Sequence, residues 1–128
     1  MIPEGLGYTK THEWAKRDGT TITVGITHHA QEELKDIVFV EAPAHGTTVT
    51  AGQPCAVVES VKAAFDIYAP VSGKVVRMNE ELARKPQLIN EDCYGKGWFF
   101  TVEASDPAQW DALMTATVYA KLLMAGHA

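Results

Sequence analysis

Turn-forming residues divide this chain of 128 residues into short runs, and the division limits the folds open to it. The pair Asp18-Gly19 separates residues 12–17 from residues 20–26, and the second run places apolar side chains at every other position. Alternation with a period of two predicts a half-buried strand, and Asp-Gly is a strong hairpin turn. We therefore predict a β-hairpin over residues 12–26.

Further strand-like runs follow the hairpin, at residues 36–42, 54–60, 65–69, 74–79 and 97–104. The run at 36–42 is so rich in β-branched and aromatic residues that we expect a strand buried on both faces. Residues 28–34 predict a short helix with Thr27 as its N-cap, and residues 80–84 predict a helical turn. The pattern is that of a mainly β domain with short helices at its edges.

The C-terminal part changes character after Ser105-Asp106-Pro107, a sequence typical of a helix start. Residues 107–125 carry apolar side chains at roughly helical spacing, and an interruption near residues 116–118 leaves two short helices open. We expect this apolar stripe to pack against the sheet rather than against a partner. Taken with the strands, the elements predict a small β-sandwich or partly closed barrel.

Charge and composition narrow the function. The net charge is −5 and no basic run exceeds two residues, which argues against nucleic-acid binding. No apolar stretch approaches the length of a membrane span, and the first residues lack signal-peptide or transit-peptide character. Cys55 and Cys93 have neither redox nor metal-binding spacing, so we expect free thiols in a reducing compartment and a cytoplasmic protein.

Lys62 lies between the strand-like runs 54–60 and 65–69, where the short connection requires the chain to reverse and to leave this side chain outside. An exposed lysine alone is usually an ordinary surface residue. However, residues 59–73, ESVKAAFDIYAPVSG, closely resemble the lipoylation site of the glycine cleavage system H-proteins. The blocks His12-Glu13-Trp14 and 36–41 also resemble that family in its order, and the resemblance extends from about residue 8 to residue 123.

The resemblance implies a fold. It is the two-sheet β-sandwich, or barrel-sandwich hybrid, of the lipoyl–biotinyl carrier type, with short helices notably at the C-terminus. We expect a single lipoyl-carrier domain over residues 1–128, with its core at about 8–104 and its C-terminal helices at about 107–125. The family resemblance also suggests a monomer.

The same resemblance implies a non-catalytic carrier with lipoate attached covalently to Lys62 by a lipoylating enzyme. The arm would take an aminomethyl group from glycine decarboxylase to the tetrahydrofolate-dependent aminomethyltransferase, and dihydrolipoyl dehydrogenase would reoxidise it. Biotin carriers usually flank their lysine with methionines, whereas Val61 and Ala63 stand here, which favours lipoate. An H-like lipoyl donor or relay for other lipoyl-dependent enzymes is the alternative.

By resemblance, Thr11, Glu13 and Asp66 lie around a cleft that contacts the arm and its cationic cargo. A charge pair about 4 Å apart gains roughly 4 kcal/mol at an effective dielectric near 20, before desolvation. The gain falls to about 0–1 kcal/mol when the pair is exposed, so the hypothesis requires partial burial. The alternative for Glu13 and Asp66 is that they are ordinary surface acids.

Other chemistry has weaker support. His28 and Glu32 lie four residues apart on the predicted helix, but two ligands do not close a metal site, so we predict no metal. A hydrolase or metal enzyme using His12, Glu13 and Asp66 would show turnover without partners, and we expect none. The last alternative is an interaction module with an unmodified lysine.

Three positions depart from the family pattern. Phe65 stands where a small residue is usual, Cys93 where proline is common, and Lys35 where glycine often ends the short helix. If Lys35 takes a left-handed backbone, the cost is roughly 1–2 kcal/mol. Phe65 is close enough to Lys62 in sequence to affect docking of the lipoylating enzyme or to cap the cleft.

Overall fold

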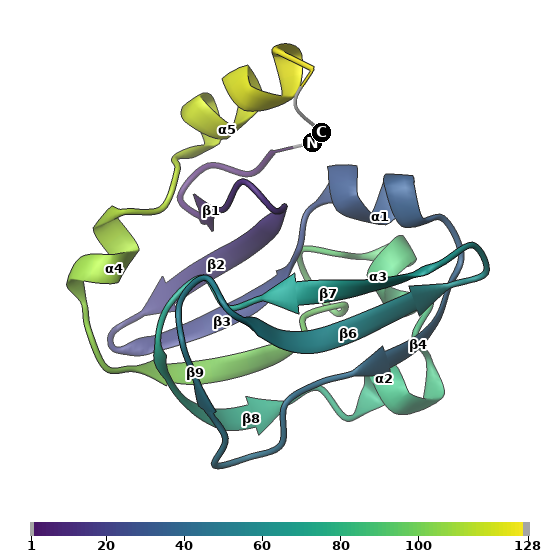
Figure 1. Ribbon diagram of the computed structural model, residues 1–128, viewed down its shortest axis with the longest axis horizontal. Helices are drawn as coiled ribbons and strands as arrows, with labels where there is room; N and C mark the ends of the chain where they lie inside the picture. The colour runs from purple at the N-terminus through teal and green to yellow at the C-terminus, as the bar shows by residue number, and fades with distance from the viewer. Residues whose placement is uncertain (1, 127–128) are drawn as a thin grey trace.

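Two antiparallel sheets face each other in the computed structural model, which describes residues 2–126 (Figure 1). The larger sheet has the strand order β1-β2-β3-β9-β8-β5 and the smaller one the order β4-β6-β7. The strands of the larger sheet are β1 (Gly7–Tyr8), β2 (Glu13–Asp18), β3 (Thr21–Ile26), β5 (Thr48–Val49), β8 (Gly73–Met78) and β9 (Phe100–Ala104). Those of the smaller sheet are β4 (Ile37–Glu41), β6 (Pro54–Ser60) and β7 (Ala64–Tyr68). The predicted two-sheet sandwich is confirmed.

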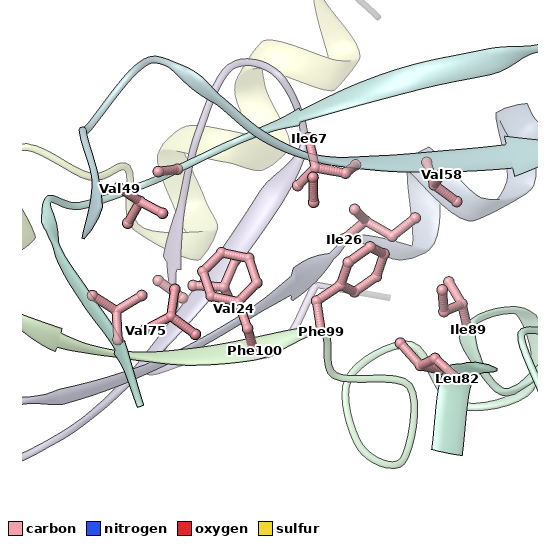
Figure 2. Packing of buried hydrophobic residues seen from close by; sticks show 14 of the residues in the cluster. Val24, Ile26, Val49, Val58, Ile67, Val75, Leu82, Ile89, Phe99 and Phe100 are labelled. Atoms are coloured by element: carbon pink, nitrogen blue, oxygen red, sulfur yellow. The ribbon is translucent and has the colours of Figure 1, made fainter. Parts of the chain in front are cut away.

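The core lies between the two sheets because their strands turn alternate apolar side chains inward. Figure 2 shows Val24 of β3 and Phe100 of β9 in the same layer, with Val58 of β6 and Ile67 of β7 packed above. The predicted hairpin is the pair β2–β3, in register from Glu13 opposite Ile26 to Asp18 opposite Thr21.

Five short helices surround the sheets in the described part of the chain: α1 (His28–Leu34), α2 (Glu81–Arg84), α3 (Leu88–Glu91), α4 (Ala108–Asp111) and α5 (Ala116–Met124). The Thr27 side chain caps α1 by accepting from the N–H of Ala30, as predicted. The C-terminal stripe forms two helices, and α5 packs on Tyr8 of β1 and Trp14 of β2. Among residues 2–126, no helix has the length and apolar character needed to cross a membrane.

The expectation that residues 36–42 form a strand buried on both faces is half wrong. A strand is present, but Val38 is 52% exposed and Phe39 is 48% exposed. β4 is an edge strand of the smaller sheet, and its register shifts between Ile37 and Phe39 where a bulge interrupts the pairing. Composition cannot distinguish a core strand from an edge strand with an uncovered face.

Lys35 ends α1 with a φ of 67°, a backbone conformation that favours glycine. Asn90 holds this connection: its side chain donates to the Lys35 carbonyl at 2.6 Å and accepts from the N–H of Ile37 at 3.0 Å. Lys35, which stands where the family often has glycine, therefore has a strained backbone conformation. Hydrogen bonds from Asn90 of α3 hold the chain in that conformation.

Candidate functional site

Lys62 stands at the tip of the hairpin between β6 and β7, with its side chain exposed as expected. The N–H of Ser60 donates to the Ala63 carbonyl at 2.9 Å and closes the turn. The buried Ser60 hydroxyl oxygen accepts from the N–H groups of Lys62 at 3.1 Å and Ala63 at 3.3 Å. These local side-chain bonds hold the tip in one conformation.

The tip is also fastened to its surroundings. The N–H of Val61 donates to the Asp36 carbonyl at 3.1 Å, so the hairpin tip lies beside the connection from α1 to β4 (Figure 1). The Nζ atom of Lys62 lies 3.5 Å from the Glu33 carbonyl, at the limit of a hydrogen bond. Within residues 2–126, no carboxylate forms an ion pair with this amine. The amine is therefore accessible and only weakly held.

A cleft of about 440 Å³ opens beside Lys62, between β7, α1 and the loop before β2. Its apolar lining consists of Ile26, Ala30, Leu34, Phe65 and Ile67. The remaining lining residues are Lys10, Thr11, His12, His29, Glu33, Lys62, Asp66 and Tyr68. The volume is within the range of small-ligand sites, about 300–1,000 Å³. A cleft with this lining has space for a flexible apolar chain with a polar end.

Glu13 is fully buried and does not line the cleft. Its carboxylate accepts from the hydroxyls of Thr9 and Thr11 and, at 3.0 Å, from the N–H of Tyr68. Burial raises the pKa of the Glu13 carboxyl, and these hydrogen bonds oppose the rise. Glu13 is thus neither an ordinary surface acid nor a direct contact of the cleft. It is a buried anchor behind Thr11.

Thr11 and Asp66 line the same cleft as Lys62. Both residues are exposed, and Asp66 is opposite Val57 in the pairing of β6 with β7. The partial burial required for a strong charge interaction is therefore absent at Asp66. Any contact that Asp66 makes with a cation in the cleft lies at the weak end of the expected range.

A hydrogen-bonded network forms a further wall of the cleft. Nδ1 of His12 lies 2.7 Å from the Tyr119 hydroxyl, which lies 2.8 Å from Oγ1 of Thr27. The His12 and His29 rings are 4.6 Å apart. The pKa of His12 is lowered by burial and by His29, and raised to a smaller extent by Glu33. The lowered pKa of His12 favours the neutral imidazole at the cleft wall.

Sequence reasoning missed three of these cleft components: His29, Glu33 and the supporting Tyr119. The sequence does carry a signal for two of them. His29 and Glu33 are four residues apart, so they lie on one face of α1, and both line the cleft. Tyr119 has no such signal, since it is 107 residues from His12 in the chain.

The structure gives little support for metal binding, hydrolysis or thiol chemistry by the protein's own side chains. In the part of the chain that the structure describes, no group of three or more His, Cys, Asp or Glu side chains is placed to hold a metal ion. Nδ1 of His12 is engaged by Tyr119 and Glu13 is buried behind Thr11, so the structure does not assemble the hydrolytic set of His12, Glu13 and Asp66. Cys55 and Cys93 are free, and burial raises their pKa values to about 12 and about 11.

Comparison with known proteins identifies the family of this chain. A family model described as Glycine cleavage H-protein matches residues 6–126. The glycine cleavage system H protein of Myxococcus xanthus is 50% identical over 122 residues, which are 95% of each chain. That of Carboxydothermus hydrogenoformans is 54% identical over 123 residues, covering 96% of this chain and 95% of the relative.

A solved structure gives the same result. The crystal structure of a glycine cleavage system H protein from Mycobacterium marinum matches with a TM-score of 0.87 at 40% sequence identity. The match covers 94% of this chain and 97% of the other. The comparisons of sequence and of fold give the same result, and the chain belongs to the glycine cleavage H-protein family, whose members are non-catalytic carriers with lipoate on a lysine.

Proposed function

We propose that Lys62 is the lysine that carries lipoate, and that the protein moves the aminomethyl group of glycine between the enzymes of glycine cleavage. The exposed amine at the tip of a hydrogen-bonded hairpin is the observation that supports this most directly. An amine without an ion-pair partner is available for acylation, and a stiff tip presents it in the same place to each enzyme.

The residues around Lys62 fit an apolar arm with a polar end. The cleft begins at Lys62, and its apolar lining includes Ile67 and Phe65. Each buried methylene of an arm would contribute about 0.8 kcal/mol, so a few such contacts suffice for a reversible resting place. When attached, the lipoyl group would supply a disulfide that accepts the aminomethyl group as it opens, and a dithiol would remain after the group is released.

The polar side chains of the cleft contact the cargo in this proposal. Thr11 and Asp66 are among the residues that line the cleft, and Glu13 acts through the Thr11 hydroxyl that its carboxylate holds. Because Asp66 is exposed, its attraction for a cation is about 0–1 kcal/mol. Such weak contacts orient a cationic group without trapping it, which suits a carrier that must unload.

Four enzymes are the partners that we propose: glycine decarboxylase, the tetrahydrofolate-dependent aminomethyltransferase, dihydrolipoyl dehydrogenase and a lipoylating enzyme. The net charge of −5 favours docking faces that are basic. We further propose a monomer in the cytoplasm, where the free thiols of Cys55 and Cys93 would stay reduced. Light scattering of the purified protein tests the monomer.

Intact mass spectrometry tests the attachment site. After co-expression with a lipoylating enzyme and lipoate, we expect the wild-type mass to rise by one lipoyl group and the mass of Lys62→Arg to stay unchanged. Lys74→Arg, at an exposed position in β8, is the matched control and should be modified like the wild type. Modification of the Lys62→Arg protein would refute Lys62 as the attachment site.

Exchange of glycine carboxyl carbon with bicarbonate tests the carrier role. We expect the lipoylated protein to support this exchange with glycine decarboxylase and the unmodified protein to support none. A protein that serves only as a lipoyl donor or relay would be lipoylated at Lys62 and still fail to support exchange.

A further inference from the structure

We infer that the outer face of the smaller sheet docks the enzyme that attaches the lipoyl group, and that Val38 and Phe39 are its apolar contacts. The inference deepens the proposed function and rests on it, because it presupposes that Lys62 is acylated. It concerns β4, a strand that is separate in sequence from the Lys62 hairpin and lies beside it in the sheet.

Strand register defines this outer face. Phe39 is opposite Glu59, which is opposite Ala64, so these three residues form one row across β4, β6 and β7. Directly opposed residues in antiparallel strands point to the same side of a sheet. All three residues are exposed, whereas Val58, one residue along β6 from Glu59, is buried in the core. The row therefore faces away from the second sheet.

Large apolar side chains lie uncovered on and beside this face. Phe39 is 48% exposed, Val38 is 52% exposed, and Val61, next to Lys62 at the tip, is 68% exposed. The bulge that shifts the register between Ile37 and Phe39 adds a residue to β4 at this point. Exposed apolar groups that gather in one place typically mark an interaction site.

The reaction at Lys62 indicates which partner protein binds this outer face. In the attachment step the Lys62 amine attacks the carbonyl of an activated lipoyl donor, an acyl adenylate or acyl thioester, and the amine loses a proton. A carbon–nitrogen bond forms while the bond to the leaving group breaks. This enzyme must bring its reacting centre to Nζ itself, before any arm exists. Enzymes that act at the far end of an arm do not need such a close approach.

The size of an ordinary interface places Phe39 within reach. A typical protein interface covers about 800 Å² on each partner, which is a disc of roughly 16 Å radius. Phe39 is opposite Glu59, three residues before Lys62, and three residues of strand span about 10 Å. An enzyme centred on Lys62 that covers this side of the hairpin therefore also covers Phe39.

Charge adds a second constraint on the partner. The next row of the same face contains Glu41, Val57 and Asp66, so Glu41, Glu59 and Asp66 place carboxylates on the same face as Phe39. The complementary surface has an apolar pocket within a basic rim. Such a rim steers association and makes it sensitive to salt.

Lipoylation kinetics test the inference. The unmodified Phe39→Ser protein is incubated with a purified lipoate–protein ligase, lipoate and ATP, and modification at Lys62 is followed by intact mass. We expect kcat/KM for the protein substrate to fall about tenfold, because loss of a large aromatic contact weakens the encounter with the ligase. Val118→Ser is the matched control, because Val118 is 49% exposed on α5, away from the sheet face. We expect its lipoylation to match the wild type.

Two further measurements identify the cause of a slow reaction. Acetylation of Lys62 by a small amine-reactive ester and the thermal unfolding midpoint should be the same in wild type and Phe39→Ser. Equal lipoylation of all three proteins would overturn the inference. So would a Phe39→Ser protein that is lipoylated normally but no longer supports exchange with glycine decarboxylase, since the face would then belong to that enzyme. If wild type itself is never modified at Lys62, the proposed function fails first, and the inference fails with it.

Discussion

The hydroxyl of Tyr119 lies 2.7 Å from Nδ1 of His12, and this contact joins the C-terminal helix α5 to the wall of the cleft. The same hydroxyl lies 2.8 Å from Oγ1 of Thr27, the N-cap of α1. Tyr119 is fully buried, and its ring stacks on Tyr8 of β1 with centroids 4.8 Å apart. One side chain therefore sets the spacing between two cleft walls that come from distant parts of the chain.

Replacement of Tyr119 by phenylalanine tests this link. The change keeps the stacked ring and removes one hydroxyl, which leaves the polar groups of His12 and Thr27 without a shared partner. We expect the free energy of unfolding to fall by about 1–3 kcal/mol, the usual cost of an unsatisfied buried group. Urea denaturation measures it.

Tyr68→Phe is the control for Tyr119→Phe, because the Tyr68 hydroxyl makes no hydrogen bond to another described residue although it lines the same cleft. Its loss should change stability by less than about 0.5 kcal/mol. Equal losses in the two variants would show that the bridging hydroxyl does not stabilise the fold.

The titration of His12 reports the electrostatics of the cleft. Burial and His29 lower its pKa below the usual 6.5, while Glu33 opposes them. We therefore expect the His12 ring signals in NMR to titrate below pH 6.5. The pKa should fall further in Glu33→Gln and rise in His29→Gln. Titration of His12 at or above 6.5 would contradict the arrangement.

The lowered pKa of His12 also makes the stability of the fold depend on pH. Because the folded pKa of His12 is lower than the unfolded one, its contribution to stability is complete above pH 6.5. That contribution is lost as the pH falls through the folded value. Replacing His12 by asparagine should remove this part of the acid sensitivity, measured by urea denaturation between pH 5 and pH 7.5.

Much of the strand pattern is predictable from sequence because local signals and packing agree there. Asp18-Gly19 predicts the turn of the β2–β3 hairpin, and Thr27 predicts the start of α1. The two-residue strands β1 and β5 are too short to show a periodic pattern, so they escape prediction. The exposure of Phe39 could not be predicted either, because it depends on which strand lies at the edge of the assembled sheet.

In the candidate site too, features set by local sequence could be predicted, whereas features set by distant partners could not. The position of Lys62 at the bend follows from the two runs that flank it, and Thr11 and Asp66 both line the cleft beside it. The burial of Glu13 was not predictable, because it depends on the Tyr68 N–H supplied by β7, 55 residues later in the chain. Long-range partners of this kind determine whether an acid is buried, and local sequence carries little information about them.

Glu13 makes stability depend on pH in the opposite sense to His12. Its folded pKa is raised above the ordinary 4.5, so its contribution to stability is complete below pH 4.5 and is lost as the pH rises through the folded value. Glu13→Gln cannot titrate and lacks this dependence. We therefore expect the stability difference between wild type and variant to shrink as the pH rises from 4 to 8 in urea denaturation series.

Glu41→Gln, at an exposed position on β4, controls for the loss of one carboxylate in the Glu13 experiment. A difference between wild type and Glu13→Gln that stays constant or grows with pH would show that the hydrogen bonds from Thr11 and Tyr68 outweigh burial. In that case the carboxylate would be held ionised throughout.

Ser60→Ala tests whether the hairpin tip is stiff because of one hydroxyl. The variant loses the acceptor for the N–H groups of Lys62 and Ala63, so these two amides should exchange with solvent faster in NMR hydrogen exchange. We expect a modest loss of about 0.5–1.5 kcal/mol in unfolding free energy. Ser72→Ala is the matched control, because Ser72 also accepts from a backbone amide, that of Ala51 at 2.9 Å, but lies outside the β6–β7 hairpin. If the Lys62 amide exchanges equally fast in both variants, the Ser60 hydroxyl does not order the tip, and the backbone bond from Ser60 to Ala63 is sufficient.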